Sequence, residues 1–112
     1  MSHSKYADCI RACIECAQAC ELCADSCLSE SDVTKMAECI RTDRDCSQIC
    51  WTAAAYLSRD SQFAAEICRI CADICEACAA ECEKHDMDHC QKCAKACREC
   101  GEQCHKMAGV HA

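Results

Sequence analysis

The spacing of its cysteines is the feature that most restricts what this chain can fold into. The 112-residue sequence contains 19 cysteines and no proline. In three long stretches the cysteines follow one another at alternating intervals of three and four residues, as in CIRACIECAQACELCADSC at positions 9–27. These intervals place all the cysteines of a stretch on one face of an α-helix, where a bundle helix normally carries leucine. Arg11, Glu15 and Gln18 lie on the opposite face, so we expect the thiols to point into a core.

The polar segments between these stretches divide the chain into four predicted helices. The helices are expected at 4–28, 33–57, 62–84, and from Asp86 or Asp88 to about 107. The polar residues at 29–32, 58–61 and 85–88 break the pattern and offer N-caps for the helices that follow. Such short connections between long helices make neighbours antiparallel. We therefore predict a single domain over residues 1–112, an all-α, antiparallel up-down-up-down four-helix bundle with a cysteine-lined core.

Neither packing nor disulfide bonds explain so many inward cysteines. The chain has only three leucines, one phenylalanine and one tryptophan. A core filled by thiols alone would be loosely packed, at about 1 kcal/mol for each missing methyl-sized volume. Cysteines at i,i+3 and i,i+4 on one helix have Cβ atoms roughly 5–6 Å apart, whereas a disulfide needs about 3.8 Å. We therefore expect the thiols to bind metal.

The arrangement of the thiols favours Cu(I) over the other thiophilic metals. Soft thiolates select Cu(I), zinc or iron–sulfur clusters. Zinc sites and iron–sulfur motifs use discrete groups of ligands, whereas these cysteines form unbroken stripes. One Cu(I) per thiolate is also electrically neutral, which avoids a buried net charge. We predict many Cu(I) ions bound as thiolate clusters, with a zinc-thiolate buffer and an iron–sulfur electron-transfer protein as the alternatives. The predicted ligands are Cys9, Cys13, Cys16, Cys20, Cys23, Cys27, Cys39, Cys46, Cys50, Cys68, Cys71, Cys75, Cys78, Cys82, Cys90, Cys93, Cys97, Cys100 and Cys104.

The charge and the N-terminal sequence restrict the partners and the cellular location that we expect for the chain. The formal net charge of −7 argues against a nucleic-acid partner. No apolar run is long enough to span a bilayer, and MSHSKYADC at positions 1–9 has no leader signature. We predict a cytoplasmic protein without a membrane partner, whose thiols stay reduced. No nucleophile–base pair indicates an enzyme, so we predict a non-enzymatic role.

The sequence resembles the bacterial copper storage protein family, in particular its cytosolic branch. The likeness covers essentially the whole chain and is carried by CIRTDRDCSQIC at 39–50 and EICRICADICEACAAECEKHDMDHCQKCAKAC at 66–97. The resemblance implies a four-helix bundle whose inward cysteines bind many Cu(I) ions, and a homotetramer of such bundles. It also implies a role in sequestering excess copper and supplying it, with a copper chaperone or a cuproenzyme acceptor as the expected protein partner.

Histidines and methionines near the ends of the bundle are candidates for copper entry. The antiparallel layout brings His85, His89 and Met36 to one end, and Met107 and His111 to the other. Imidazole and thioether groups suit Cu(I) transfer. We predict that copper enters at the His85 end. The alternative is that these residues are solvent-exposed parts of a turn and a tail.

Two further predictions concern one end of the bundle and an acidic residue of the second helix. The end opposite His85 receives Trp51, Tyr56, Leu57 and Phe63, and we expect these apolar residues to plug it. Asp43 takes a place near a missing thiol in the second helix. We expect Asp43 to pair with an arginine or a neighbouring helix, and a hydrogen-bonding or oxygen-ligand role is the alternative.

Overall fold

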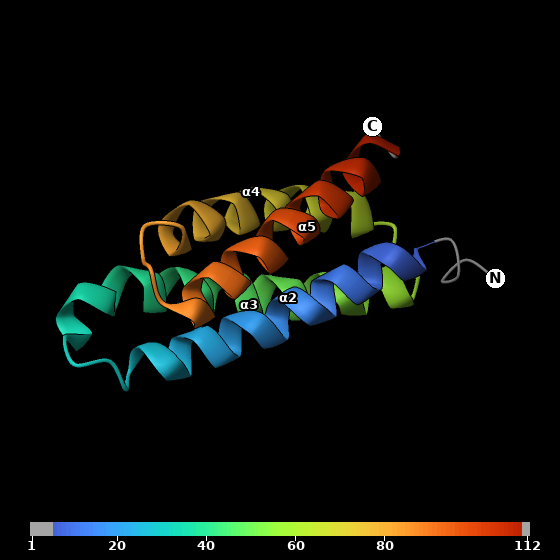
Figure 1. The fold of residues 1–112 in the computed structure, drawn as a ribbon. Coiled ribbons are helices and arrows are strands. Elements are labelled where there is room, and N and C mark those ends of the chain that lie inside the picture. Colours follow the sequence, from blue (N-terminus) through green and yellow to red (C-terminus); the bar gives the residue numbers. More distant parts are fainter. Residues whose placement is uncertain (1–5, 111–112) are drawn as a thin grey trace.

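Four antiparallel helices form most of the described structure. The computed structural model describes residues 6–110. Its helices are α2 (Ala7–Cys27), α3 (Ala37–Ser58), α4 (Ala64–Cys82) and α5 (Asp88–Val110), with a short 3₁₀ helix, η1 (Val33–Met36), before α3 (Figure 1). No strand occurs between residues 6 and 110. The prediction of an all-α, up-down-up-down four-helix bundle is confirmed.

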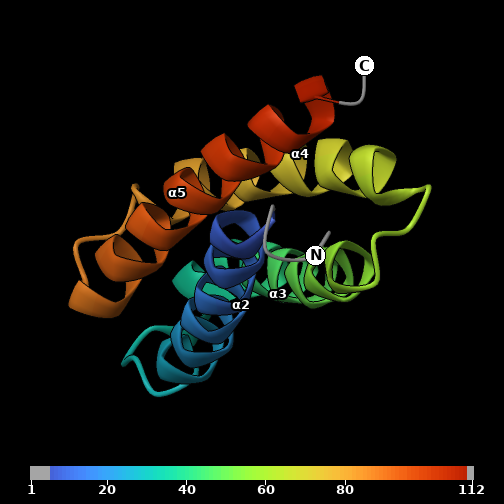
Figure 2. The same ribbon diagram turned by 90° about the vertical axis from the view of Figure 1, so that its right-hand side faces the viewer.

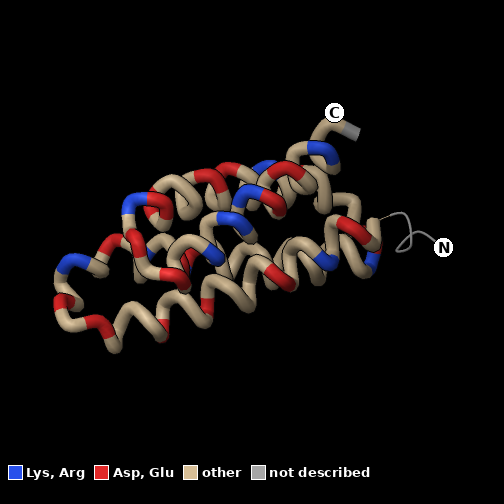
Figure 3. The backbone as a smooth tube through the Cα atoms, viewed as in Figure 1, with Lys and Arg blue, Asp and Glu red and all other residues tan. Residues whose placement is uncertain are grey.

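Each helix packs against two others, which encloses a single central core. Contacts join α2 to α3, α3 to α4, α4 to α5, and α5 back to α2. Figure 2 shows the α2–α3 pair lying against the α4–α5 pair. The bundle is elongated, with extents of 47 × 20 × 17 Å. Acidic and basic residues are interspersed along all four helices (Figure 3). Asp43 is the one acidic or basic residue buried in the described chain, so charge lies mainly on the outside of the bundle.

The helix boundaries differ from the predicted ones mainly at the start of the second helix. Residues 33–36 form a 3₁₀ turn because the Asp32 side chain accepts a hydrogen bond from the Lys35 backbone N–H. A tight turn of this kind is common where a helix begins. The turn carries Met36 inward, where only 1% of its surface remains exposed.

The connection between α3 and α4 reverses the chain within five residues. Asp60 adopts a left-handed conformation with φ of 51°, which Asp and Asn tolerate better than other non-glycine residues. The Ser61 N–H donates to the Tyr56 carbonyl and the Asp60 N–H donates to the Leu57 carbonyl. This pair of bonds is a Schellman motif, which satisfies the last carbonyls of α3 and directs α4 back along the bundle.

One end of the bundle is closed by larger side chains. Tyr6, Leu57 and Met107 are 4%, 0% and 8% exposed, and all three lie where α2 begins and where α3 and α5 end. Trp51 and Phe63, which we expected in this plug, are 42% and 52% exposed and lie outside it. The plug therefore consists of one tyrosine, one leucine and one methionine with small residues around them.

Leu57 is the one fully buried leucine, so its truncation tests the packing of the closed end. Leu57→Ala is expected to lower the free energy of unfolding of the reduced apoprotein by about 2–5 kcal/mol, because it leaves a cavity. Leu22, which is 63% exposed, provides a matched control, and Leu22→Ala should stay within about 0.5 kcal/mol of the wild type. Urea unfolding followed by circular dichroism measures both. Equal effects of the two substitutions would contradict the assigned packing.

Candidate metal centre

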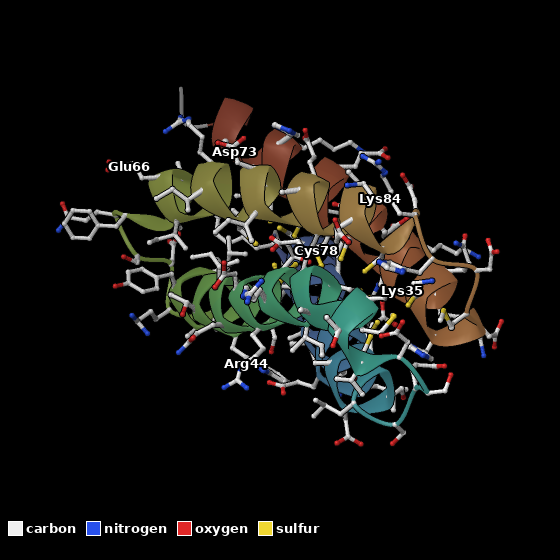
Figure 4. All side chains as sticks on the ribbon, turned by 90° about the vertical axis from the view of Figure 1, so that its left-hand side faces the viewer. Lys35, Arg44, Glu66, Asp73, Cys78 and Lys84 are labelled. Carbon is white, nitrogen blue, oxygen red and sulfur yellow. The ribbon has the colours of Figure 1, made fainter. Side chains whose placement is uncertain are left out.

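A continuous column of thiols fills the core of the bundle. All 19 cysteines are free and buried, and Cys9 alone retains any exposed surface, at 3%. Figure 4 shows the sulfur atoms lying between the helices, with Cys78 of α4 among them. The helices present their thiols inward because the three-and-four spacing keeps them on one face. The cysteines predicted as ligands therefore share one enclosed space, which is the first requirement for a common metal centre.

The sulfur atoms of different helices lie almost at the distance at which a metal ion would hold them. Near the closed end, Cys13 Sγ lies 3.7 Å from the sulfurs of Cys100 and Cys104. In the middle of the bundle, Cys46 Sγ lies 3.7 Å from Cys16 Sγ and 3.7 Å from Cys75 Sγ. Two thiolates on one ion, with bonds of about 2.3 Å, are separated by about 3.8–4.6 Å depending on the bond angle. Metal can therefore enter with little movement of the backbone.

Groups of four sulfurs follow one another along the axis and share members. Within each group the four ligand atoms lie within 4.8 Å of one another. Cys16 and Cys46 each belong to at least two groups, and so do Cys20 and Cys97. A shared thiolate must bridge metal ions, so the column suits multinuclear clusters better than separate tetrahedral sites. The groups include Cys13/Cys71/Cys100/Cys104, Cys16/Cys46/Cys50/Cys75, Cys16/Cys20/Cys46/Cys97, Cys20/Cys78/Cys93/Cys97 and Cys23/Cys27/Cys39/Cys90.

The thiols do not share one acidity, because each sits in a different hydrogen-bond environment. We call the end of the bundle opposite the Leu57 plug the open end. Burial raises the pKa of Cys27 and of Cys90, which lie at this end. Hydrogen bonds from Cys39 and Cys82 lower the pKa of Cys23 to about 5, against the opposing effect of burial. Thiolates are the metal-binding form, so filling the column releases protons. Cys23 is the thiol of the open end best prepared to meet a cation.

Asp43 is a buried acid surrounded by thiols rather than by arginines. Its side chain is fully buried, and its Oδ1 accepts hydrogen bonds from the thiols of Cys93 at 3.2 Å, Cys78 at 3.3 Å and Cys82 at 3.5 Å. Of the predicted partners, the arginine is wrong, because Arg41 binds Glu38 on the surface, whereas the neighbouring helices and the hydrogen-bonding role are confirmed by the contacts with α4 and α5. The spacing of Asp43 from Cys39 and Cys46 repeats the four-three pattern, so the helix turns it inward like a thiol.

The electrostatic state of Asp43 follows from this burial. Removal from water, reinforced by repulsion from the Cys93 thiolate, raises the pKa of the Asp43 carboxyl to about 12. The carboxyl is therefore protonated at neutral pH in the metal-free protein. Its Oδ1 lies within 3.2–3.5 Å of three thiols from α4 and α5, and its Oδ2 lies 3.9 Å from the sulfur of Cys39, so the column also contains an oxygen donor.

The open end carries two histidines in different surroundings. His89 Nδ1 lies 3.4 Å from the sulfur of Cys23 and 3.5 Å from that of Cys90, and its Nε2 lies 2.8 Å from Glu30 Oε2. Burial alone would lower the pKa of His89, but the hydrogen bonds with Cys23 and Glu30 raise it. His89 therefore belongs to the same cluster as the outermost thiols. The cysteine pattern alone could not reveal this, since the partner Glu30 comes from a loop.

His85, predicted as the leading entry residue, lies at the predicted end of the bundle but not against the thiols. Its Nε2 lies 3.0 Å from Glu81 Oε2 on the same helix, and no hydrogen bond joins its ring to a thiol of the described chain. His85, Met36 and Met87 line a cavity of about 470 Å³ at this end of the bundle, together with Glu30 and other polar residues. His85 therefore belongs to the wall of a vestibule rather than to the thiol cluster.

The remaining predicted entry residues lie at the opposite end. Met107 is buried in the plug, and His111 lies outside the described residues. The neighbouring His105 binds Glu76 on the outer surface of α4 and α5. The two ends therefore differ. One is packed with apolar side chains, whereas the other has a cavity lined by His85 and a second histidine, His89, in contact with the thiols.

Comparisons with known proteins agree with this geometry. The profile of the copper storage protein family matches residues 2–109. The Cu(I)-bound copper storage protein BsCsp3 is 56% identical, with a TM-score of 0.86 over 89% of this chain and 94% of that one. A cytosolic copper storage protein from Streptomyces lividans, loaded with five coppers, is 41% identical, with a TM-score of 0.91 over 96% of this chain and 95% of that one. Another structure of the Streptomyces lividans protein, loaded with ten copper equivalents, is 43% identical, with a TM-score of 0.90 over 93% of this chain and 83% of that one. No curated protein matches the chain.

The raised pKa of Asp43 predicts how pH affects the stability of the metal-free bundle. The folded chain keeps a proton that the unfolded chain loses above about pH 4, so the stability contributed by this carboxyl declines as pH rises toward about 12. Asp43→Asn cannot lose that proton. The free energy of unfolding of Asp43→Asn, relative to that of the wild type, should therefore increase by up to about 1.4 kcal/mol per pH unit between about pH 5 and about pH 7.

Urea unfolding of the reduced apoprotein across that range measures the difference between variant and wild type. Asp45→Asn changes the same residue type on the exposed side of the same helix and serves as the control. It should follow the wild type at every pH. A gap between Asp43→Asn and the wild type that does not change with pH would show that Asp43 is ionised in the folded state.

Proposed function

The chain belongs to the copper storage protein family, and from that membership we propose that it stores Cu(I) as thiolate clusters inside its four-helix bundle. Its role is storage rather than catalysis. We place it in the cytoplasm, as for the cytosolic copper storage protein of Streptomyces lividans. In the described chain, no helix is long and apolar enough to cross a membrane.

The observation that carries the proposal is the overlap between neighbouring groups of four thiols. A zinc ion held by four thiolates keeps a net charge of −2, and burying such charges in succession is costly. Shared thiolates also leave too few ligands to complete a separate tetrahedron for each zinc. Cu(I) and thiolate in equal numbers are neutral, and a bridging thiolate serves two ions at once. The column therefore fits many Cu(I) ions better than a few divalent ones.

The same geometry separates storage from electron transfer by an iron–sulfur cluster. Such clusters are held by discrete cysteine motifs that wrap around each cluster. Here the thiols come from straight helix faces along most of the bundle, with no loop enclosing them. All 19 cysteines are the proposed ligands, and His89 joins them at the open end. We further propose that the protein sequesters excess copper, which a copper chaperone delivers, and later supplies it to a cuproenzyme.

We also propose that the chain assembles as a homotetramer, as the family resemblance implies. A groove of about 440 Å³ between α2 and α3 is lined by Leu28, which is 58% exposed, and Trp51, which is 42% exposed. Glu21 and Arg44 line the same groove. In a two-fold symmetric contact the arginine of one copy meets the acid of the other, so this face is complementary to itself. Exposed tryptophan next to arginine is typical of protein interfaces.

The central prediction concerns copper capacity. Titration of the reduced protein with Cu(I) in the absence of oxygen should reach an endpoint near one ion per cysteine, that is, near 19 per chain. The product should be colourless, because Cu(I) bound by thiolates is a d¹⁰ ion. A parallel titration with Zn²⁺ should end at far fewer ions, because each one adds buried negative charge. An endpoint of a few copper ions, or a brown protein as purified, would reject storage in the column.

The proposed interface is tested by introducing charge into the groove. Trp51→Glu and Leu28→Glu should each shift the protein from tetramer toward smaller species, because an acid would face the buried centre of the contact. Leu22→Glu provides the control, since Leu22 is equally exposed on α2 but borders a different surface near α5. Size-exclusion chromatography with light scattering measures the mass. A wild-type monomer, or dissociation by Leu22→Glu instead, would contradict the assignment.

A further inference from the structure

Glu30 lies outside the helices and has no part in the thiol column, yet it contacts the cluster at the open end. It follows α2 in the short connection to η1, and its side chain is 29% exposed. Its Oε2 lies 2.8 Å from Nε2 of His89, a residue 59 positions later at the start of α5. This contact ties the loop after α2 to the first turn of α5 across the mouth of the bundle.

The contact determines which nitrogen of His89 faces the thiols. An Nε2–H that donates to the Glu30 carboxylate leaves the lone pair of the neutral imidazole on Nδ1. Nδ1 lies 3.4 Å from the sulfur of Cys23 on α2 and 3.5 Å from that of Cys90 on α5. Three donor atoms from two helices therefore converge at one point, beside the group Cys23/Cys27/Cys39/Cys90 at the open end of the column.

We infer that Glu30 is a positioning residue for copper entry, which holds the His89 ring so that Nδ1, Cys23 and Cys90 form the first acceptor set for incoming Cu(I). This inference rests on the proposed storage function. A carboxylate on the far nitrogen of a metal-binding histidine fixes the tautomer and the ring orientation. Without Glu30 the ring can turn, and either nitrogen can carry the proton.

The transfer step requires no change of oxidation state. Cu(I) arrives bound to a thiolate of its donor, since free Cu(I) is not available in a cell rich in thiols. The bond from copper to the donor sulfur breaks as a bond to Cys23 forms, and Nδ1 of His89 supplies a second ligand. Cys23 reacts as a thiolate and the donor leaves as a thiolate, so no proton has to move. Copper remains Cu(I), and charge and protons balance.

Two other histidine–carboxylate pairs show that the contact with thiols is what distinguishes Glu30. His85 is held by Glu81 on its own helix, and the pair lies on the vestibule side without a hydrogen bond to a described thiol. His105 is bound to Glu76 on the outer surface, where both side chains are about half exposed. Among the histidines that the structure describes, His89 alone joins a carboxylate on one side to the thiol column on the other.

The experiment measures how fast reduced apoprotein takes Cu(I) from a coloured Cu(I)–bicinchoninate complex, by stopped-flow absorbance. Glu30→Ala should slow uptake by about tenfold or more, since loss of such a supporting carboxylate typically costs about 10–100-fold. Glu30→Gln keeps an acceptor for the Nε2–H and should restore most of the rate. Glu76→Ala removes the same charge and the same kind of histidine contact at the outer surface, and should match the wild type.

A double variant and a spectroscopic measurement separate positioning from other roles. If Glu30 acts through His89, Glu30→Ala in a His89→Ala background should cause no further slowing. In the apoprotein, ¹⁵N correlations of the neutral His89 ring should show protonation at Nε2 in the wild type and a mixture of tautomers in Glu30→Ala. A residue that only supports the loop would leave the tautomer unchanged.

The outcomes keep this inference distinct from the storage function. Full wild-type rates in Glu30→Ala, or equal slowing by Glu30→Gln and Glu30→Ala, would overturn positioning, and equal slowing would indicate simple attraction of a cation. Slowing by Glu76→Ala as well would point to net charge. The storage function is judged separately, by the wild-type copper endpoint alone. A low endpoint rejects storage whatever the rates are.

Discussion

The distance between facing sulfur atoms is the constraint on which the rest of this structure depends. A helix that carries a thiol at every third or fourth residue keeps all of them on one face, and four such helices bring these faces together. The resulting separations, such as 3.7 Å between Cys46 and Cys75 and 3.6 Å between Cys39 and Cys82, are contacts between free thiols and not the bond of about 2.05 Å of a disulfide. They are close to what two thiolates on one metal ion require. Ordinary helix packing therefore positions the ligands without any dedicated loop.

The same constraint explains why the rest of the core is so small. Between the thiols lie buried alanines, such as Ala17, Ala72 and Ala79, and large side chains are confined to the ends. Larger residues in the middle would separate the helices and lengthen the sulfur–sulfur distances. A core of this kind gains little from apolar burial compared with one of leucine and isoleucine, so bound metal must supply part of the cohesion of the loaded protein.

Much of this architecture could be predicted from the sequence, because it depends on periodicity and on connection length. The four helices, their antiparallel order and the inward thiols all follow from spacing that is visible in one dimension. The partners of Asp43 and His89 could not be predicted in that way, since they depend on contacts between segments far apart in the chain. The spacing placed Asp43 on the thiol face, but it does not reveal that the partners of its carboxyl are thiols and not an arginine. Glu30 gave no signal, because a glutamate in a polar loop is ordinary until the fold places it against a histidine.

The two ends of the bundle give the column a direction. At the closed end, Leu57 and Tyr6 are packed over the column and only 3% of Cys9 is exposed, so a copper ion cannot reach Cys13 from outside without displacing packed side chains. At the open end, Cys23 has a depressed pKa and a histidine beside it, so a thiolate and a second ligand are available together. Ions that enter there must move inward by exchange between neighbouring thiolates, since facing sulfurs lie within about 4 Å of one another and the central groups share sulfurs. The protonated carboxyl of Asp43 lies along that path beside Cys93 and Cys78, where it can accept hydrogen bonds from thiols that have not yet met copper and release them one by one as the clusters form.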